Sequence, residues 1–190
     1  FDYQYTVTGD DEKNKSGFEG RYLNLILNGK INDDLTYHFR QRFNVPNSDN
    51  PGIFKSTDWI YLTYRYNRNF TVSAGKQVVA IGGYEYDRAP IDLYFCSVFW
   101  NHIGCYQFGI TLTVTDNIGK NKVSLQVVNS PFGNHNYAYN LLWAGNMGWF
   151  QTLYSVNMIE YRKGKYMNYL SLGNKITAGR FTLEFDWMNR

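Results

Sequence analysis

The chain has 190 residues, enough for one large domain or two small ones, and its formal net charge is only +3. Its 19 Lys and Arg residues are scattered, so the charge pattern does not indicate a nucleic-acid partner. No stretch approaches the ~18 uninterrupted apolar residues of a transmembrane helix, which excludes that class of membrane protein. Aromatic residues make up 18% of the chain, led by 17 Tyr, and Tyr and Trp suit a boundary between oil and water.

Alternation of apolar and polar residues with period two predicts strands along most of the chain. In Leu35–Asn44, Leu, Tyr and Phe alternate with Thr, His and Arg. A helix would mix these two sets on every face, whereas a strand separates them. The expected strands lie at 1–8, 18–28, 35–44, 57–67, 69–78, 106–115, 121–129, 137–144, 149–158, 165–174 and 180–187. There are about eleven such segments, and each is long enough to cross a bilayer as a tilted strand.

The connectors between these strands alternate in length. Short polar turns are expected at 30–34, 67–69, 116–120, 145–148 and 175–179, and longer segments at 9–17, 45–56, 79–104, 130–136 and 159–164. In an up-and-down barrel every second connector lies on the same side of the membrane, and outer-membrane barrels have tight periplasmic turns and extended outer loops. A Greek-key sandwich has no reason to keep this order. We therefore expect an all-β fold, an antiparallel up-and-down transmembrane β-barrel, over residues 1–190.

The longest connector, 79–104, is too apolar for a solvated outer loop. Pro90 could begin a short helix, because its missing N–H costs nothing at a first helical position. Such an amphipathic loop could fold into the barrel as a constriction, and this interpretation is favoured over a helix packed on the outer rim. The expected constriction residues are Tyr84, Glu85, Asp87 and Arg88.

At this loop the sequence resembles a known family. The run from Ser73 to Pro90, with its Gly-Lys-Gln segment, resembles barrels of the Bacteroides type in the phosphate-selective porin O and P family. The segments His38–Asn44, Thr57–Leu62 and Asn129–Phe132 add to the resemblance, which covers essentially the whole chain. It implies a porin of about 16 strands in the bacterial outer membrane, usually a homotrimer in contact with outer-membrane lipid, that passes anions through a basic constriction.

A full family member is about twice as long as this chain. The about eleven expected strands are an odd number for a class whose bacterial single-chain members have even counts. The chain also ends at Trp187-Met188-Asn189-Arg190, without the terminal aromatic residue typical of such barrels. We therefore expect that both ends of the protein are missing.

The alternation also predicts which side chains face the lumen. A lipid-facing Arg near the bilayer midplane would cost roughly 2–4 kcal/mol, so the basic positions of the strands should face water. The expected anion-interacting residues are His38, Arg40, Arg42, Arg65, Lys76, Arg88 and Lys122. Together they predict a preference for small anionic or polar solutes, with phosphate as one candidate. Two alternatives to an anion preference stay open. Facing rows of Arg and acidic residues could only set a transverse electric field across the lumen, and Asp87 and Arg88 could have the structural role of fixing the loop in place.

The sequence contains few signals for a disulfide, an enzyme active site or a metal site. The pair Cys96 and Cys105 could form a disulfide in an oxidising periplasm, or could be two buried thiols. The three His residues have no nucleophile or ligand spacing around them, so we expect no enzymatic activity, no metal and no cofactor. The alternative functions are a specific oligosaccharide or peptide channel and a structural barrel of a larger envelope assembly. Trp59 and Tyr61, whose alternation points inward, are the residues that would discriminate between a sugar path and a lipid-facing girdle.

Overall fold

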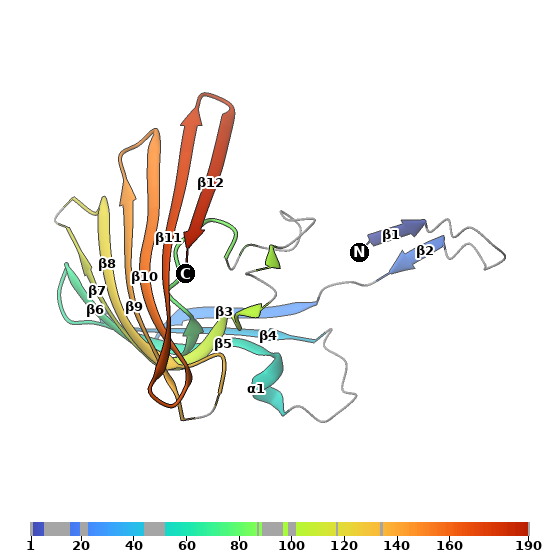
Figure 1. The fold of residues 1–190 in the computed structure, drawn as a ribbon, viewed down its shortest axis with the longest axis horizontal. Coiled ribbons are helices and arrows are strands. Elements are labelled where there is room, and N and C mark those ends of the chain that lie inside the picture. Colours follow the sequence, from blue (N-terminus) through green and yellow to red (C-terminus); the bar gives the residue numbers. More distant parts are fainter. Residues whose placement is uncertain are drawn as a thin grey trace.

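Most of the chain forms one strongly curved antiparallel sheet (Figure 1). The computed structural model describes residues 2–5, 16–19, 23–43, 52–86, 88, 97–98, 102–116, 118–133 and 135–189. The sheet contains β3 (Asn24–Lys30), β4 (Leu35–Arg42), β5 (Thr57–Arg65), β6 (Phe70–Val78), β7 (Tyr106–Thr115), β8 (Asn121–Asn129), β9 (Tyr137–Asn146), β10 (Phe150–Arg162), β11 (Lys165–Ala178) and β12 (Phe181–Asn189). Two further strands, β1 (Asp2–Tyr5) and β2 (Ser16–Glu19), pair with each other in a separate sheet.

Each strand of the large sheet pairs with its neighbours in the chain, in the order β12 to β3. This is the up-and-down antiparallel topology that the sequence predicts. The sheet is open, with β3 and β12 as its two edges. Helix α1 (Ile53–Ser56) is a single turn that precedes β5. Among the described residues, no helix has the length and the apolar composition that a membrane crossing would need.

Three of the expected elements differ from the structure. The turn expected at 175–179 is shorter, because β11 continues to Ala178. The strand expected at 18–28 is divided between β2 and β3. The connector expected at 159–164 is only a turn at 163–164, because β10 continues to Arg162 and β11 begins at Lys165. Gly164 permits this turn, since its φ of 71° is a left-handed conformation that costs a glycine nothing. The Gly164 N–H also donates a hydrogen bond of 2.7 Å to Glu160 Oε1.

The convex face of the sheet is apolar. Its large side chains are exposed from β3 to β12, including Leu27, Ile60, Leu62, Tyr64, Ile110, Leu112, Val114, Val123, Leu125, Val127, Leu141, Val156, Leu183 and Phe185. These residues are one of the two alternating sets of each strand, as the sequence predicts. A continuous apolar surface of this kind is unfavourable in water, so the face is suited to contact with lipid.

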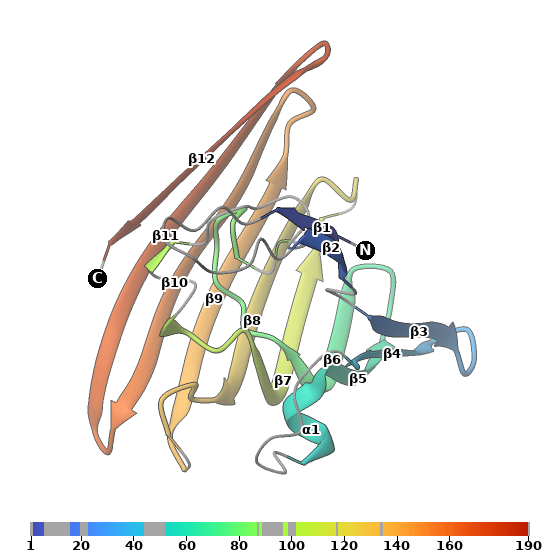
Figure 2. The ribbon, with the colours of Figure 1, turned by 90° about the vertical axis from the view of Figure 1, so that its right-hand side faces the viewer.

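The concave face is crossed by the chain segment that follows β6 (Figure 2). We call residues 79–86 of this segment the inner strap. Its apolar side chains pack with inner-face residues of β8 to β11, and this contact is the hydrophobic core of the described chain. The core consists of Val79, Ile81, Tyr86, Ile103, Val128, Ala138, Ile159 and Tyr169. The core therefore lies between the inner strap and the sheet, and it holds the strap against the strands.

Candidate pore-lining site

The backbone of the inner strap is hydrogen-bonded to side chains of the strands. The Ala80 N–H donates to Gln126 Oε1 on β8 at 2.7 Å, and Asn157 Nδ2 on β10 donates to the Ala80 carbonyl oxygen at 2.9 Å. A strap that leaves the ladder of the sheet must find other partners for its backbone groups, because buried unpaired N–H and C=O groups are costly. Both polar backbone groups of Ala80 are satisfied in this way.

Gly82 repeats this arrangement two residues later. Its N–H donates to Ser155 Oγ on β10 at 2.7 Å, and Ser171 Oγ on β11 donates to its carbonyl oxygen at 2.8 Å. The strap lies so close to β10 that a Cβ at Gly82 would stand 2.5 Å from the Leu153 carbonyl oxygen. Only glycine fits this approach, which explains why the strap contains Gly at this position.

The side chains that hold the strap also bond to one another. Asn157 Nδ2 donates to Asn140 Oδ1 at 2.7 Å, and Asn140 Nδ2 donates to Gln126 Oε1 at 3.0 Å. Ser155 Oγ donates to Asn157 Oδ1 at 2.6 Å. All four side chains are buried. The strap is therefore supported by a connected polar network that runs across β8, β9 and β10, and such networks hold a single arrangement when every member is satisfied.

At its far end the strap is attached to β12. Asp186 Oδ2 accepts the N–H groups of Tyr84 and Glu85 at 2.7 and 2.9 Å. Arg88 Nη2 lies 2.6 Å from Glu184, which also pairs with Lys175 of β11 at 3.1 Å. Burial, followed by the nearby charges of Glu184 and Asp186, raises the pKa of the Tyr84 phenol, so the neutral form is favoured there.

Sequence reasoning placed Tyr84, Glu85 and Arg88 in a constriction but missed the residues that hold them. The missed residues are Asn140, Ser155, Asn157, Ser171 and Lys175. A signal for them exists, because each is a polar residue in the inward set of a strand whose other set is largely apolar. Asp87, also expected in the constriction, lies outside the described residues.

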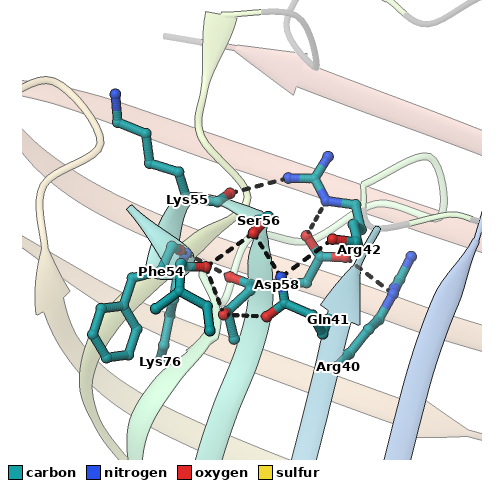
Figure 3. Close-up of polar contacts among 10 residues, drawn as sticks. Arg40, Gln41, Arg42, Phe54, Lys55, Ser56, Asp58 and Lys76 are labelled. Atoms are coloured by element: carbon teal, nitrogen blue, oxygen red, sulfur yellow. Dashed lines mark hydrogen bonds and ion pairs between the residues drawn. The ribbon is translucent and has the colours of Figure 1, made fainter. Parts of the chain in front are cut away.

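Arg40 and Arg42 share one carboxylate (Figure 3). Arg40 Nε lies 3.0 Å from Asp58 Oδ2, and Arg42 Nε lies 2.8 Å from Asp58 Oδ1. The Asp58 side chain is only 1% exposed, whereas Arg42 is 38% exposed. The guanidinium of Arg40 also stacks over the Trp59 ring, 4.7 Å from its centroid. Arg40, Arg42 and Asp58 therefore carry a combined charge of about +1. Asp58 was not among the residues that sequence reasoning selected.

Lys76 lies elsewhere than expected. In the ladder it is opposite Ile60 and Phe108, which belong to the exposed apolar face. Its Nζ donates to the carbonyl oxygens of Phe54 in α1, at 2.5 Å, and Thr57, at 2.6 Å (Figure 3). These bonds anchor α1 to the end of β6. The structure therefore corrects the expectation that Lys76 lines the lumen: its ammonium supports the rim, because the alternation of β6 turns it to the convex side.

The remaining basic residues are spread over the sheet. His38 stacks on Tyr61, with ring centroids 4.7 Å apart, and its Nδ1 lies 3.1 Å from Asn28 Oδ1. Arg65 is at the opposite end of the strands, where it pairs with Asp34 at 3.7 Å. Lys122 is exposed near the same end, opposite Ala144 in the ladder. The structure therefore brings Arg40 and Arg42 together on Asp58, with Lys76 close by on the other side of α1 (Figure 3). His38, Arg65 and Lys122 have separate partners or positions.

The disulfide expectation involves Cys96, which lies outside the described residues, so it stays a prediction. Pro90 and the helix expected after it lie outside the described residues as well, apart from isolated positions.

A cavity of about 440 Å³ opens between the inner strap and the concave face. Aromatic, hydroxyl and amide side chains of β5 to β8 line it together with apolar residues of the strap, β9 and β10. The lining residues are Trp59, Tyr61, Ser73, Gln77, Val78, Val79, Ala80, Ile81, Tyr86, Thr111, Ser124, Gln126, Leu142 and Leu153. None of these lining residues is charged. Trp59 and Tyr61 thus lie on the concave side of the sheet, away from the exposed apolar face.

The sheet with an apolar convex face and a strapped concave face fits the wall of a pore. Consistent with this geometry, residues 1–148 match the family model described as phosphate-selective porin O and P. The chain belongs to this porin family. No curated protein and no solved structure matches it. The assignment confirms the predicted family and indicates a channel and not an enzyme, whereas the Bacteroides type stays a prediction.

Proposed function

We propose that this porin lies in the bacterial outer membrane and gives passive diffusion to small hydrophilic solutes past a constriction that the inner strap forms. One observation carries the proposal: hydrogen bonds hold the strap against the concave face of β8 to β12, and an ion pair of Arg88, just after the strap, attaches the segment to β12. A segment held in this way occupies the space through which a solute would pass. The exposed apolar face supports contact with outer-membrane lipid.

We further propose that the lumen prefers anions. Arg40 and Arg42 exceed Asp58 by one positive charge at the rim beside α1. At the end of the strap, Glu184 and Asp186 offset the charges of Arg88 and Lys175, and Glu85 adds one further negative charge, so this end does not contribute to an anion preference. An excess of about one unit charge in a narrow passage raises the local concentration of anions, although modestly. Phosphate is the candidate solute that the family name supports, and a homotrimer is the candidate assembly.

Planar-bilayer recordings of the full-length protein test this proposal. We expect discrete conductance steps and, under a salt gradient, a reversal potential that favours anions. Arg42→Gln should reduce that preference while the protein still folds, because Arg42 is partly exposed and Arg40 keeps its pair with Asp58. A reversal potential that favours cations in the unmodified protein would refute the anion preference, and the absence of any conductance would refute the pore.

One observation favours a second candidate, a channel for a specific neutral solute. The cavity beside the strap is lined by three aromatic rings, of Trp59, Tyr61 and Tyr86, and by uncharged polar groups. This candidate is compatible with a porin scaffold, since the same lumen can hold a binding site beside a passage.

A further inference from the structure

We propose that the cavity between the inner strap and the concave face is a binding site for a neutral pyranose ring, such as a hexose unit. The proposal rests on the proposed pore function, because the site lies in its lumen, and it goes beyond that function by naming a solute class. It is argued from the shape and chemistry of the cavity walls.

Two aromatic side chains form one wall of the cavity. Trp59 and Tyr61 are two residues apart on β5, so both project from the same face of the strand. The other lining residues come from β6 to β10 and from the strap, which places the rings on the β5 side of the space. A pyranose presents a flat surface of C–H groups, and aromatic rings offer a flat apolar surface to pack against it. The spacing of the two rings along β5 extends this surface.

Two residues of β4 stack on the rings of Trp59 and Tyr61. The Arg40 guanidinium lies 4.7 Å from the centroid of the Trp59 ring, and the His38 ring stacks on Tyr61 at 4.7 Å with 17° between the planes. In the ladder, Arg40 is opposite Trp59 and His38 is opposite Tyr61. Trp59 also meets Tyr106 of β7 edge-on, with ring centroids 6.0 Å apart, and both Trp59 and Tyr61 still line the cavity. These contacts restrict the rings before binding, which reduces the entropy that a ligand must offset.

The part of the cavity that β6 and β8 line offers hydrogen bonds without charge. Ser73 Oγ lies 2.8 Å from Thr63 Oγ1, and Ser124 Oγ lies 2.8 Å from Thr113 Oγ1. A hydroxyl has one donor and two acceptor positions, so each of these residues retains capacity for a ligand hydroxyl. An anion in the same place would have no cation among the lining side chains. The lining therefore favours a polyhydroxylated neutral solute over phosphate at this position.

The size of the cavity agrees with this class. Its volume of about 440 Å³ falls in the ~300–1,000 Å³ range of small-ligand pockets. A ring with its hydroxyl groups can enter such a space and leave it again, as transport requires, because the contacts are few and uncharged.

Equilibrium binding to the refolded full-length protein in detergent tests the site without depending on conduction. Isothermal titration with methyl glucoside should give saturable binding, while mannitol, an acyclic polyol of similar size, should bind at least about tenfold more weakly, a difference of about 1.4 kcal/mol. Tyr61→Ala should weaken methyl glucoside binding by a similar factor. The matched control is Tyr64→Ala, because Tyr64 is on the same strand but belongs to the exposed convex face.

Three outcomes would overturn the site: no saturable sugar binding, equal binding of mannitol, or equal effects of Tyr61→Ala and Tyr64→Ala. Trp59→Phe provides a second variant that keeps a ring beside Arg40 and should weaken binding less than Trp59→Ala does. Bilayer recordings on the same preparation separate the two proposals. Conductance without sugar binding leaves the pore and removes the site, whereas sugar binding without conductance leaves the site and removes the pore.

Discussion

Replacing Asp58 with Asn should increase the anion preference of the pore and weaken the fold at the same time. Asp58 is the carboxylate shared by Arg40 and Arg42, at 3.0 and 2.8 Å, and its side chain is 1% exposed. The substitution nearly preserves shape but removes one negative charge. In the unmodified protein the two arginines and Asp58 sum to +1 (2 − 1). In the variant the arginines are no longer offset, and the sum is +2.

The effect on selectivity depends on the Coulomb energy between the one unit charge that is added at position 58 and an ion that passes through the pore. At ~10 Å in water this energy is about 0.4 kcal/mol, and screening lowers it to about 0.15 kcal/mol in 0.1 M salt. Anions and cations are shifted in opposite directions, so the permeability ratio should change by about 1.7-fold in 0.1 M salt and about threefold in 0.01 M salt. Reversal potentials at both salt concentrations measure this ratio and its salt dependence.

The effect on stability follows from the burial of the carboxylate. Removing one partner of a buried ion pair typically costs about 3–5 kcal/mol, and the partial exposure of Arg42 places the expectation near 3 kcal/mol. Urea unfolding in detergent measures this loss. Asp34→Asn is the control, because Asp34 pairs with Arg65 at the other end of the strands and both side chains are more than half exposed. Its effect should stay below about 1 kcal/mol. A ratio that is unchanged, or that moves toward cations, in Asp58→Asn would refute the reasoning.

Three further results are expected. Gly82→Ala should displace the strap, because the new Cβ would lie 2.5 Å from a backbone carbonyl oxygen of β10. Single-channel conductance should then rise, and an unchanged conductance would show that the strap does not limit the current. Asn157→Ala should cost about 1–3 kcal/mol in urea unfolding, because it leaves buried acceptors without their donor; a loss no larger than that of an exposed polar substitution would contradict the network. Finally, hydrogen bonds from Asn121 hold the pKa of the Asp116 carboxyl below its usual range, so this turn should contribute stability above that range and lose it as the pH falls through the lowered pKa. Comparing the acid unfolding of Asp116→Asn with that of the unmodified chain measures the effect, and identical pH profiles would count against it.

The strands and their two faces could be predicted from the sequence because their pattern is local. In β7, each residue between Tyr106 and Thr115 lies on a face that is decided by whether its number is odd or even. The same rule placed Arg40, Arg42, Trp59 and Tyr61 on one face, which is the concave face in the structure. The rule failed for the extent of β10 and β11, because a turn can be as short as two residues wherever a glycine such as Gly164 accepts a positive φ.

The charges and contacts of the lumen depended on residues far apart in the chain. The rule for faces says nothing about which residue of one strand lies beside which residue of another, since that depends on register and on the path of the connectors. Arg42 and Asp58 meet only because of a register irregularity between β4 and β5.

Sequence by itself therefore determined the all-β class, the up-and-down order and the division into an apolar and a polar face, because these follow from spacing along one strand. Only the tertiary structure decided that Asp58 offsets the arginines, that Lys76 supports the rim, and that the inner strap is held by side chains such as Asn157 and Asp186. The bond between Tyr84 and Asp186 joins residues 102 positions apart, and no local pattern carries that information.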